Sequence, residues 1–181
     1  MITQDDHILV REVLEGKISS FELLIDKYQK PVYNLVFKMT GDEEQAKDLT
    51  QDVFIKVYEK LGSFNFKHKF FSWIYRIAIN DTISFLKSGR IFERLSDLGE
   101  LQDEPSTGKI REDQRTKLHA ALRQLKPDSR SIILLKYFFE MSYVEIGEVM
   151  KMEEKTVKSR LFMAREKLNS LLIQNNFFDH D

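Results

Sequence analysis

The stretch that decides the fold class reads SYVEIGEVMKMEEKTVKSRLFMAREKL and covers residues 142–168. Ser142 and Glu145 have the spacing of a capping box, which predicts the start of a short helix over 142–150. A turn of about three or four residues then leads into a second helix that begins near Glu154. Two helices joined by such a short turn predict a helix-turn-helix.

The second helix of this pair is strongly basic. Residues 155–167 hold five Lys or Arg side chains and one Glu, a net charge of +4. An apolar stripe turns one face of the helix inward and leaves the opposite face for a ligand. A helix of this kind fits the major groove of B-DNA, with Lys158 and Ser159 near base edges and Phe162 near a thymine methyl group. The alternative is a solvated basic face on an ordinary helical hairpin.

A second basic segment lies in the first half of the chain. Residues 61–94 contain six Lys or Arg side chains and two acidic ones, a net charge of +4, with seven aromatic side chains interleaved from Phe64 to Phe85. Cations for the backbone and rings for unstacked bases are what single-stranded nucleic acid requires. The alternative is core packing, which we expect for Trp73 because of its helical spacing. The loop from Phe64 to His68 is the better candidate for ligand contact.

The remainder of the chain is also helical in pattern. Gly41 stands where an apolar segment stops, as a glycine after a helix does. Capping sequences occur at Ser19 with Glu22 and at Asp42 with Gln45. Pro31 lies inside the second segment and is expected to kink or break it. The predicted helices of this part of the chain cover residues 3–15, 20–40, 42–61 and 69–88.

A change of composition divides the chain into two domains. Residues 95–112 are acidic and contain Gly, Pro and Ser, and their periodic apolar spacing fades. A segment of this length is too long for a turn inside one compact domain. We therefore predict an all-α protein with two small helical domains, 1–94 and 113–181, joined by a flexible acidic linker over 95–112.

Composition excludes several classes of protein. The chain of 181 residues has no cysteine, which excludes disulfide scaffolds and thiolate zinc sites. Its four histidines lie apart and none has the spacing of an HExxH metal site, and no Gly-rich phosphate loop occurs. We therefore expect no catalytic residue, no metal and no cofactor, and hence no enzyme. The apolar runs are too short to span a membrane, which indicates a soluble, cytoplasmic protein without membrane insertion.

The near-neutral net charge of −1 hides a strong alternation along the chain. Residues 1–60 carry 8 basic and 12 acidic groups, a net of −4, immediately before the +4 of residues 61–94. A neutral average therefore does not exclude DNA binding, which depends on local charge.

Three stretches together resemble a known family, the bacterial sigma factors of the extracytoplasmic-function (ECF) group, in the sigma-70 family. GDEEQAKDLTQDVF, residues 41–54, resembles the helix of that family that binds core RNA polymerase. FFSWIYRIAIN, residues 70–80, resembles the minus-ten recognition helix. Residues 142–168 resemble the helix-turn-helix that reads the minus-thirty-five element. The resemblance extends over 5–90 and 113–172.

This resemblance implies a promoter-specificity subunit and assigns roles to particular residues. The domains become a region 2-like domain (1–94) and a region 4-like domain (113–181). The residues implied in binding core polymerase are Asp48, Leu49, Gln51, Asp52 and Phe54. Those implied at the minus-ten element are Phe64, Lys67, His68, Lys69, Arg76 and Asn80. Those implied at the minus-thirty-five element are Lys155, Thr156, Lys158, Ser159, Arg160, Phe162 and Arg165.

The implied partners are promoter DNA, an anti-sigma factor and core RNA polymerase, contacted at the clamp helices of its largest subunit and at the flap of its second-largest subunit. Three positions depart from the family pattern. Met163 stands where the family often has Arg, Lys151 replaces the turn glycine, and Glu153 replaces a small residue. The alternative function is a helix-turn-helix regulator that binds DNA without polymerase, which would leave the pattern over 42–80 without a purpose.

Overall fold

The computed structural model describes residues 5–88, 112–175 and 177, and this part of the chain contains helices and turns but no strand. The all-α prediction is therefore confirmed. The predicted linker lies almost entirely within residues 89–111, outside the described residues, so the domain limits stay a prediction. The helices are α1 (Asp6–Leu14), α2 (Ser19–Thr40), α3 (Glu43–Lys60), α4 (Phe70–Lys87), α5 (Glu112–Gln124), α6 (Pro127–Tyr137), α7 (Tyr143–Met150) and α8 (Glu154–Gln174), with a 3₁₀ turn, η1, at Leu61–Ser63.

Two of the three predicted capping sequences form. At the start of α3 the Asp42 carboxylate accepts a hydrogen bond from the backbone N–H of Gln45 at 2.9 Å. Gly41 ends α2 in the left-handed region, with φ of 75°, as expected for a glycine after a helix. The cap predicted at Ser19 is wrong, because Ile18 is already helical in conformation and its carbonyl accepts from the N–H of Phe21 at 2.8 Å. The first turn of α2 is thus capped by a backbone carbonyl and not by a side chain.

Pro31 was expected to kink or break the second helix, and the break does not occur. Helix α2 runs uninterrupted through this residue. Proline removes one hydrogen bond inside a helix, but the turns on both sides of it are held by buried side chains. Tyr28 precedes Pro31, and Val32 and Leu35 follow it, all three in the core. The packing of this apolar face therefore outweighs the cost of the backbone hydrogen bond that Pro31 removes.

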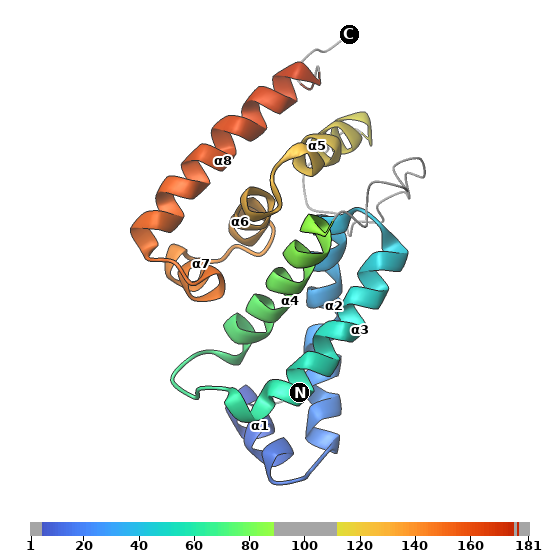
Figure 1. Cartoon of the computed structure of the whole chain (residues 1–181), viewed down its shortest axis with the longest axis vertical. Helices are drawn as coiled ribbons and strands as arrows, with labels where there is room; N and C mark the ends of the chain where they lie inside the picture. The colour runs from blue at the N-terminus through green and yellow to red at the C-terminus, as the bar shows by residue number, and fades with distance from the viewer. Residues whose placement is uncertain (1–4, 89–111, 176, 178–181) are drawn as a thin grey trace.

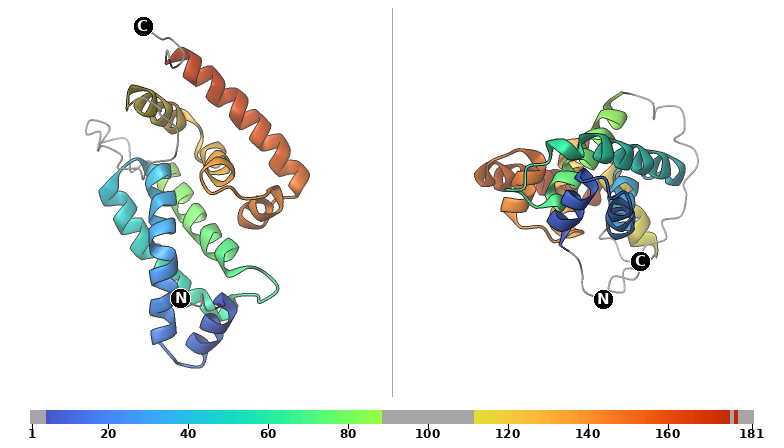
Figure 2. Two further views of the ribbon diagram at one scale, coloured as in Figure 1. Left: turned by 180° about the vertical axis from the view of Figure 1, so that it is seen from behind. Right: turned by 90° about the horizontal axis from the view of Figure 1, so that it is seen from below.

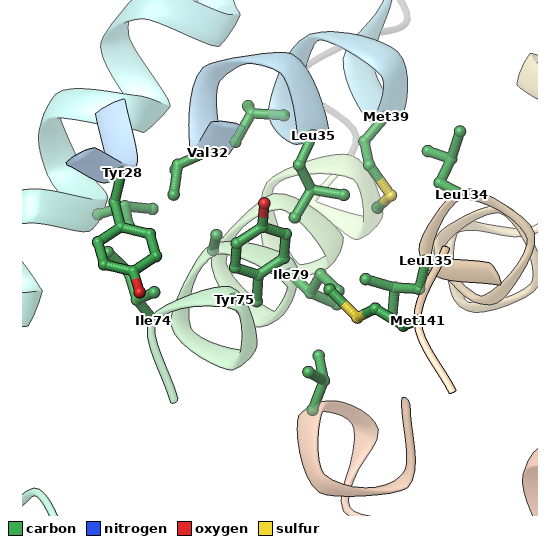
Figure 3. Close-up of a cluster of buried hydrophobic side chains, with 14 of the residues drawn as sticks. Tyr28, Val32, Leu35, Met39, Ile74, Tyr75, Ile79, Leu134, Leu135 and Met141 are labelled. Carbon is green, nitrogen blue, oxygen red and sulfur yellow. The ribbon is translucent and has the colours of Figure 1, made fainter. Parts of the chain in front are cut away.

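Helices α1–α4 form an N-terminal half (residues 5–88) and α5–α8 a C-terminal half (residues 112–177), which pack against each other. Figure 1 shows α4 beside α6 and α7, and α8 on the opposite side of the molecule from α3; the rear view in Figure 2 agrees. Side chains of both halves meet in one hydrophobic core (Figure 3). Those labelled there are Tyr28, Val32, Leu35 and Met39 of α2, Ile74, Tyr75 and Ile79 of α4, Leu134 and Leu135 of α6, and Met141.

A buried arginine joins the ends of three helices. The Arg130 side chain is 5% exposed, and its guanidinium donates to backbone carbonyls rather than to a carboxylate. It donates to Leu122 at 2.8 Å and to Leu125 at 3.3 Å, and also to the carbonyls of Arg123 and Met39. Burial, with a smaller effect of the nearby Arg123, lowers the pKa of Arg130 to about 10. The charge is thus held by the carbonyl ends of α2 and α5, where the helix dipole is negative.

Candidate nucleic-acid and polymerase interfaces

The helix-turn-helix forms as the sequence predicts. Helix α7 begins with a complete capping box, in which the N–H of Glu145 donates to Ser142 Oγ at 3.2 Å and the N–H of Ser142 donates to the Glu145 carboxylate at 3.0 Å. The turn that follows is tight, because a Cβ on Gly147 would lie 2.6 Å from the carbonyl oxygen of Met152. Lys151 ends α7 in the left-handed region, with φ of 52°, a conformation that costs a non-glycine residue some strain.

Helix α8 presents a basic face to solvent. Its inward stripe is buried at Val157, Leu161 and Ala164. Six of the seven residues predicted for duplex DNA are exposed, and Thr156 is half-buried. Phe162 and the neighbouring Met163 are 61% and 65% exposed, so this face presents two adjacent apolar side chains to solvent.

One cation of this face is already positioned. Lys158 Nζ lies 2.5 Å from the Glu154 carboxylate and 5.3 Å from the ring centroid of Tyr143. The hydrogen bond with Glu154 raises the pKa of Lys158. The side chain is therefore charged and held between α7 and α8 by these two contacts.

The residues predicted for the minus-ten element divide into exposed and buried ones. Lys67, His68, Lys69 and Asn80 are exposed, and Arg76 is half-buried. The Phe64 ring, by contrast, is only 6% exposed, so in this conformation it does not face a DNA base.

An aromatic cluster surrounds Phe64. Its ring centroid lies 5.1–5.6 Å from those of Phe66, Phe70 and Trp73. Helix α1 braces the same loop, since the ring nitrogen Nε2 of His7 lies 3.0 Å from the carbonyl oxygen of His68. Trp73 is partly buried against the core. The aromatic residues of this segment thus shape the loop that carries the exposed cations.

The residues predicted for polymerase binding lie along α3. Asp48, Gln51 and Asp52 are exposed, whereas Leu49 and Phe54 are buried at 8% and 7% exposure. Leu49 therefore helps to hold the helix in place. Phe54 lines a groove that continues from α3 onto α2.

This groove has a volume of about 740 Å³ and includes residues that the sequence analysis did not single out. Its wall on α2 includes Ile25, Gln29 and Tyr33, and Gln51 and Phe54 lie on the α3 side. The three α2 residues follow at steps of four, which is the spacing of one helix face. That regular spacing in the sequence could have indicated that these three residues share one face of α2.

The two halves also meet through polar groups, and this contact was not predicted. Lys69 Nζ lies 2.9 Å from the Glu145 carboxylate. Arg76 donates to the backbone carbonyl of Glu148, from Nε at 3.0 Å and also from Nη2. The hydrogen bond from Lys69, followed by those from Ser142, lowers the pKa of Glu145 to about 2. Glu145 thus caps its own helix and binds a cation of the other half.

Comparison with known proteins decides the family. The model of sigma-70 region 2 matches residues 24–91, and the model of sigma-70 region 4 matches residues 115–168. The chain is 33% identical to the RNA polymerase sigma-H factor of Pseudomonas aeruginosa, over 95% of this chain and 96% of the relative. The chain belongs to the sigma-70 family.

Other relatives place this sigma factor in the ECF group. It is 30% identical to the ECF RNA polymerase sigma factor SigW of Bacillus subtilis, over 90% of this chain and 94% of the relative. It is also 30% identical to the ECF RNA polymerase sigma-E factor of Escherichia coli, over 91% and 93% of the two chains.

Solved structures share the fold. CnrH in complex with the cytosolic domain of CnrY has a TM-score of 0.67 at 22% identity and covers 93% of this chain and 97% of the matched chain. The sigma factor RpoE in complex with the anti-sigma factor NepR from Bartonella quintana has a TM-score of 0.66 at 23% identity, with coverages of 84% and 96%.

Family membership establishes the general function. The chain is a promoter-specificity subunit that binds RNA polymerase and directs transcription initiation, and the stand-alone regulator is not favoured, because the match includes region 2 as well as region 4. Within the described residues, no group of three or more His, Cys, Asp or Glu side chains is arranged to hold a metal ion. The helices of that same part of the chain are too short or too polar to cross a bilayer.

Proposed function

We propose that this sigma factor starts transcription through three separate surfaces. The exposed face of α3 docks on the clamp helices of the largest polymerase subunit. The loop before α4, with α4 itself, holds the melted non-template strand of the minus-ten element. The basic face of α8 reads the duplex of the minus-thirty-five element. The protein acts in the cytoplasm and supplies no catalytic group, cofactor or metal of its own.

The docking surface combines charge with apolar area. Asp48, Gln51 and Asp52 are exposed on α3, where the two carboxylates suit a basic partner. Ile55, which is 57% exposed, and Phe54 border the groove towards α2. An apolar groove beside a charged rim has the composition of a protein interface. One observation supports this proposal most. Helix α3 packs on α2, α4 and η1 and lies on the side of the molecule away from α8 (Figure 1), so a partner bound to α3 leaves α8 accessible.

The minus-ten surface offers cations and an amide around a rigid support. Lys67, Lys69 and Arg76 supply positive charge for a single-stranded backbone, and Asn80 supplies an amide on the exposed face of α4. The buried ring of Phe64 supports the loop from beneath. Melting needs no chemistry, since capturing an unpaired base offsets the few kcal/mol that unpairing costs.

The minus-thirty-five surface lies on α8. Lys155, Arg160 and Arg165 are exposed cations that suit phosphate contacts, and the exposed Lys158, Ser159 and Phe162 suit contacts with base edges. Thr156, half-buried near the helix start, is suited to a phosphate contact by its hydroxyl group.

Partners beyond core polymerase follow by analogy. The solved relatives include a complex with the anti-sigma factor NepR and a complex with the cytosolic domain of CnrY. We extend this to a sequestering anti-sigma factor for the present chain, and to a contact between its C-terminal half and the flap of the second-largest polymerase subunit.

The test is binding to core RNA polymerase. We expect the double variant Asp48→Lys and Asp52→Lys to lose at least about tenfold in affinity in a pull-down, because reversing charges at an interface places like charges together. The matched control is Glu15→Lys with Glu166→Lys, which reverses two exposed acids elsewhere. Equal affinity of the two double variants would refute the docking face.

A further inference from the structure

Two apolar side chains lie in the middle of the surface that α8 turns away from the core. Figure 1 shows α8 at the edge of the molecule, with α5, α6 and α7 on its inner side. The helix packs inward through Val157, Leu161 and Ala164, and successive residues of an α-helix turn by about 100°. Phe162 and Met163 therefore point about 130° from the middle of this buried stripe, one on each side of the line opposite to it. Both side chains are exposed.

Cations flank this apolar pair on both sides. Arg165 lies about 70° from the middle of the buried stripe, on the same side as Phe162. Arg160 lies about 70° from it on the other side, the side of Met163. Ser159 lies between the two apolar side chains, close to the line opposite to the core, and it is exposed like both arginines. Around the exposed surface of α8 the order is therefore cation, apolar group, hydroxyl, apolar group, cation.

This order matches a cross-section of the major groove of DNA. The groove is about 12 Å wide, with base edges on its floor and a phosphate backbone along each side. A helix in the groove places its outermost side chains on base edges and its flanking cations on phosphates. Lys155 lies on the same outer face one turn before Ser159, and Glu166 lies there one turn after Phe162. The middle of the face, between these two charges, is thus uncharged.

The chemistry of the base edges decides what an apolar pair can recognise. In the major groove guanine presents two acceptors, cytosine a donor, and adenine one of each, whereas thymine presents a methyl group beside its O4 acceptor. An aromatic ring or a thioether placed over a polar edge removes water without replacing its hydrogen bonds. Placed over a thymine methyl group, the same side chain removes apolar surface of both partners from water. Thymine is therefore the base that such a pair favours.

We propose that Phe162 and Met163 together read thymine methyl groups on the same or neighbouring base pairs of the minus-thirty-five element. This inference rests on the proposed function, because it takes α8 as the helix that reads the duplex. It adds Met163 to the reading residues and names the base that the pair selects. The Cα atoms of consecutive residues are about 3.8 Å apart and stacked base pairs about 3.4 Å apart, so the two side chains reach no farther than adjacent pairs.

The test compares thymine with deoxyuridine, which lacks only the 5-methyl group. Holoenzyme assembled from core RNA polymerase and the full chain selects promoter fragments that are randomised over the minus-thirty-five window. We expect the selected fragments to carry thymine, on either strand, at one base pair or two adjacent ones in this window. The same fragments are then made with deoxyuridine in place of thymine within the window alone. Wild-type holoenzyme should bind them about three- to tenfold more weakly, because each methyl group that is covered contributes apolar burial.

Variants assign the preference to the two side chains. Phe162→Ala with Met163→Ala should bind the thymine and deoxyuridine fragments equally, and α8 should still fold because both residues are exposed and alanine favours helix. Met163→Leu keeps an apolar side chain and should keep most of the preference for thymine. The matched control is Leu23→Ala with Ile173→Ala, which removes two exposed apolar side chains elsewhere and should keep the full preference.

Four results would overturn the proposal, and they separate it from the proposed function. Equal wild-type affinity for thymine and deoxyuridine would refute methyl reading, while weaker binding by Arg160→Ala with Arg165→Ala would still support α8 as the duplex reader. Unchanged binding by that arginine variant would show that the minus-thirty-five surface itself is misassigned. A thymine preference that survives the double alanine variant would place the methyl contact on other residues.

The fourth result concerns a protein partner in place of DNA. Sedimentation of the free chain would show whether Phe162 and Met163 instead join two copies of it. Self-association that the double alanine variant abolishes, without any difference between thymine and deoxyuridine, would assign the apolar pair to that contact and not to DNA.

Discussion

Replacing Arg130 by methionine should show how much its hydrogen bonds to backbone carbonyls contribute to the stability of the fold. The guanidinium donates to four backbone carbonyls at the ends of α2 and α5. One of them, the carbonyl of Leu122, also accepts from the N–H of Leu125 at 3.1 Å and would keep that partner without Arg130. Methionine fills a similar volume with an apolar chain but donates nothing. The substitution therefore removes the hydrogen bonds and keeps most of the packing, which separates the two effects.

The cost can be worked out from the four acceptors. An unsatisfied buried carbonyl costs about 1–3 kcal/mol, and removing one partner of a buried charged network costs about 3–5 kcal/mol in all. The carbonyl of Arg123 is only partly buried at its bond to Arg130, so water can replace part of that loss. We expect the free energy of unfolding to fall by about 3 kcal/mol. With a urea dependence of roughly 2 kcal/mol per molar, the unfolding midpoint should drop by about 1.5 M.

Urea titration followed by circular dichroism measures this shift. Arg130→Lys should lose an intermediate amount, because an ammonium group cannot reach four carbonyls as a planar fork does. Arg160→Met is the control, since Arg160 is exposed on α8 and should change stability by less than about 0.5 kcal/mol. A midpoint for Arg130→Met within error of wild type would refute the argument that the carbonyls depend on this side chain.

Three further predictions follow. Lys151→Gly should stabilise the chain by about 1 kcal/mol, because glycine removes the left-handed strain, and a thermal midpoint that does not rise would contradict this. Met163→Arg should steepen the slope of log affinity for duplex DNA against log salt by about 0.9 for one new phosphate contact, whereas an unchanged slope would show that the position faces away from DNA. The folded-state pKa of Glu145, about 2, lies below the ordinary 4.5. Its pair with Lys69 therefore stabilises the fold fully above pH 4.5 and is lost as pH falls towards 2. The difference in unfolding free energy between wild type and Glu145→Gln should therefore decrease as pH falls from 4.5 towards 2. A difference that does not change with pH would show that it does not come from the pair of Glu145 with Lys69.

Features that depend on neighbouring residues could be predicted from the sequence. The helix-turn-helix followed from the capping box at Ser142 and from the basic helix after Glu154, and the structure confirms both elements. The Asp42 cap also follows a local rule, because its partner is three residues away. The Ser19 cap failed although its pattern was as good, because the carbonyl of Ile18 already served the first turn. A local pattern does not reveal which of two acceptors is used.

Features that depend on distant residues had no such signal. The partners Lys69 and Glu145 are 76 residues apart, and nothing in either stretch indicates the other. Phe64 looked like a base contact because aromatic residues in basic loops often are. Its burial is decided by Trp73 from α4 and by His7 from α1, whose ring centroid lies 5.7 Å away. Periodicity gives the face of a helix but not the neighbour that covers it.

The core shared by the two halves has a consequence during synthesis on the ribosome. The apolar face of α4 at Tyr75 and Ile79 is completed by α6, whose last residue, Tyr137, follows the end of α4 at Lys87 by about 50 residues. At translation rates of about 5–20 residues per second, that face stays uncovered for on the order of 3–10 s. Each newly made chain therefore passes through an interval in which a chaperone, a protease or another nascent chain can reach the surface that α6 later closes.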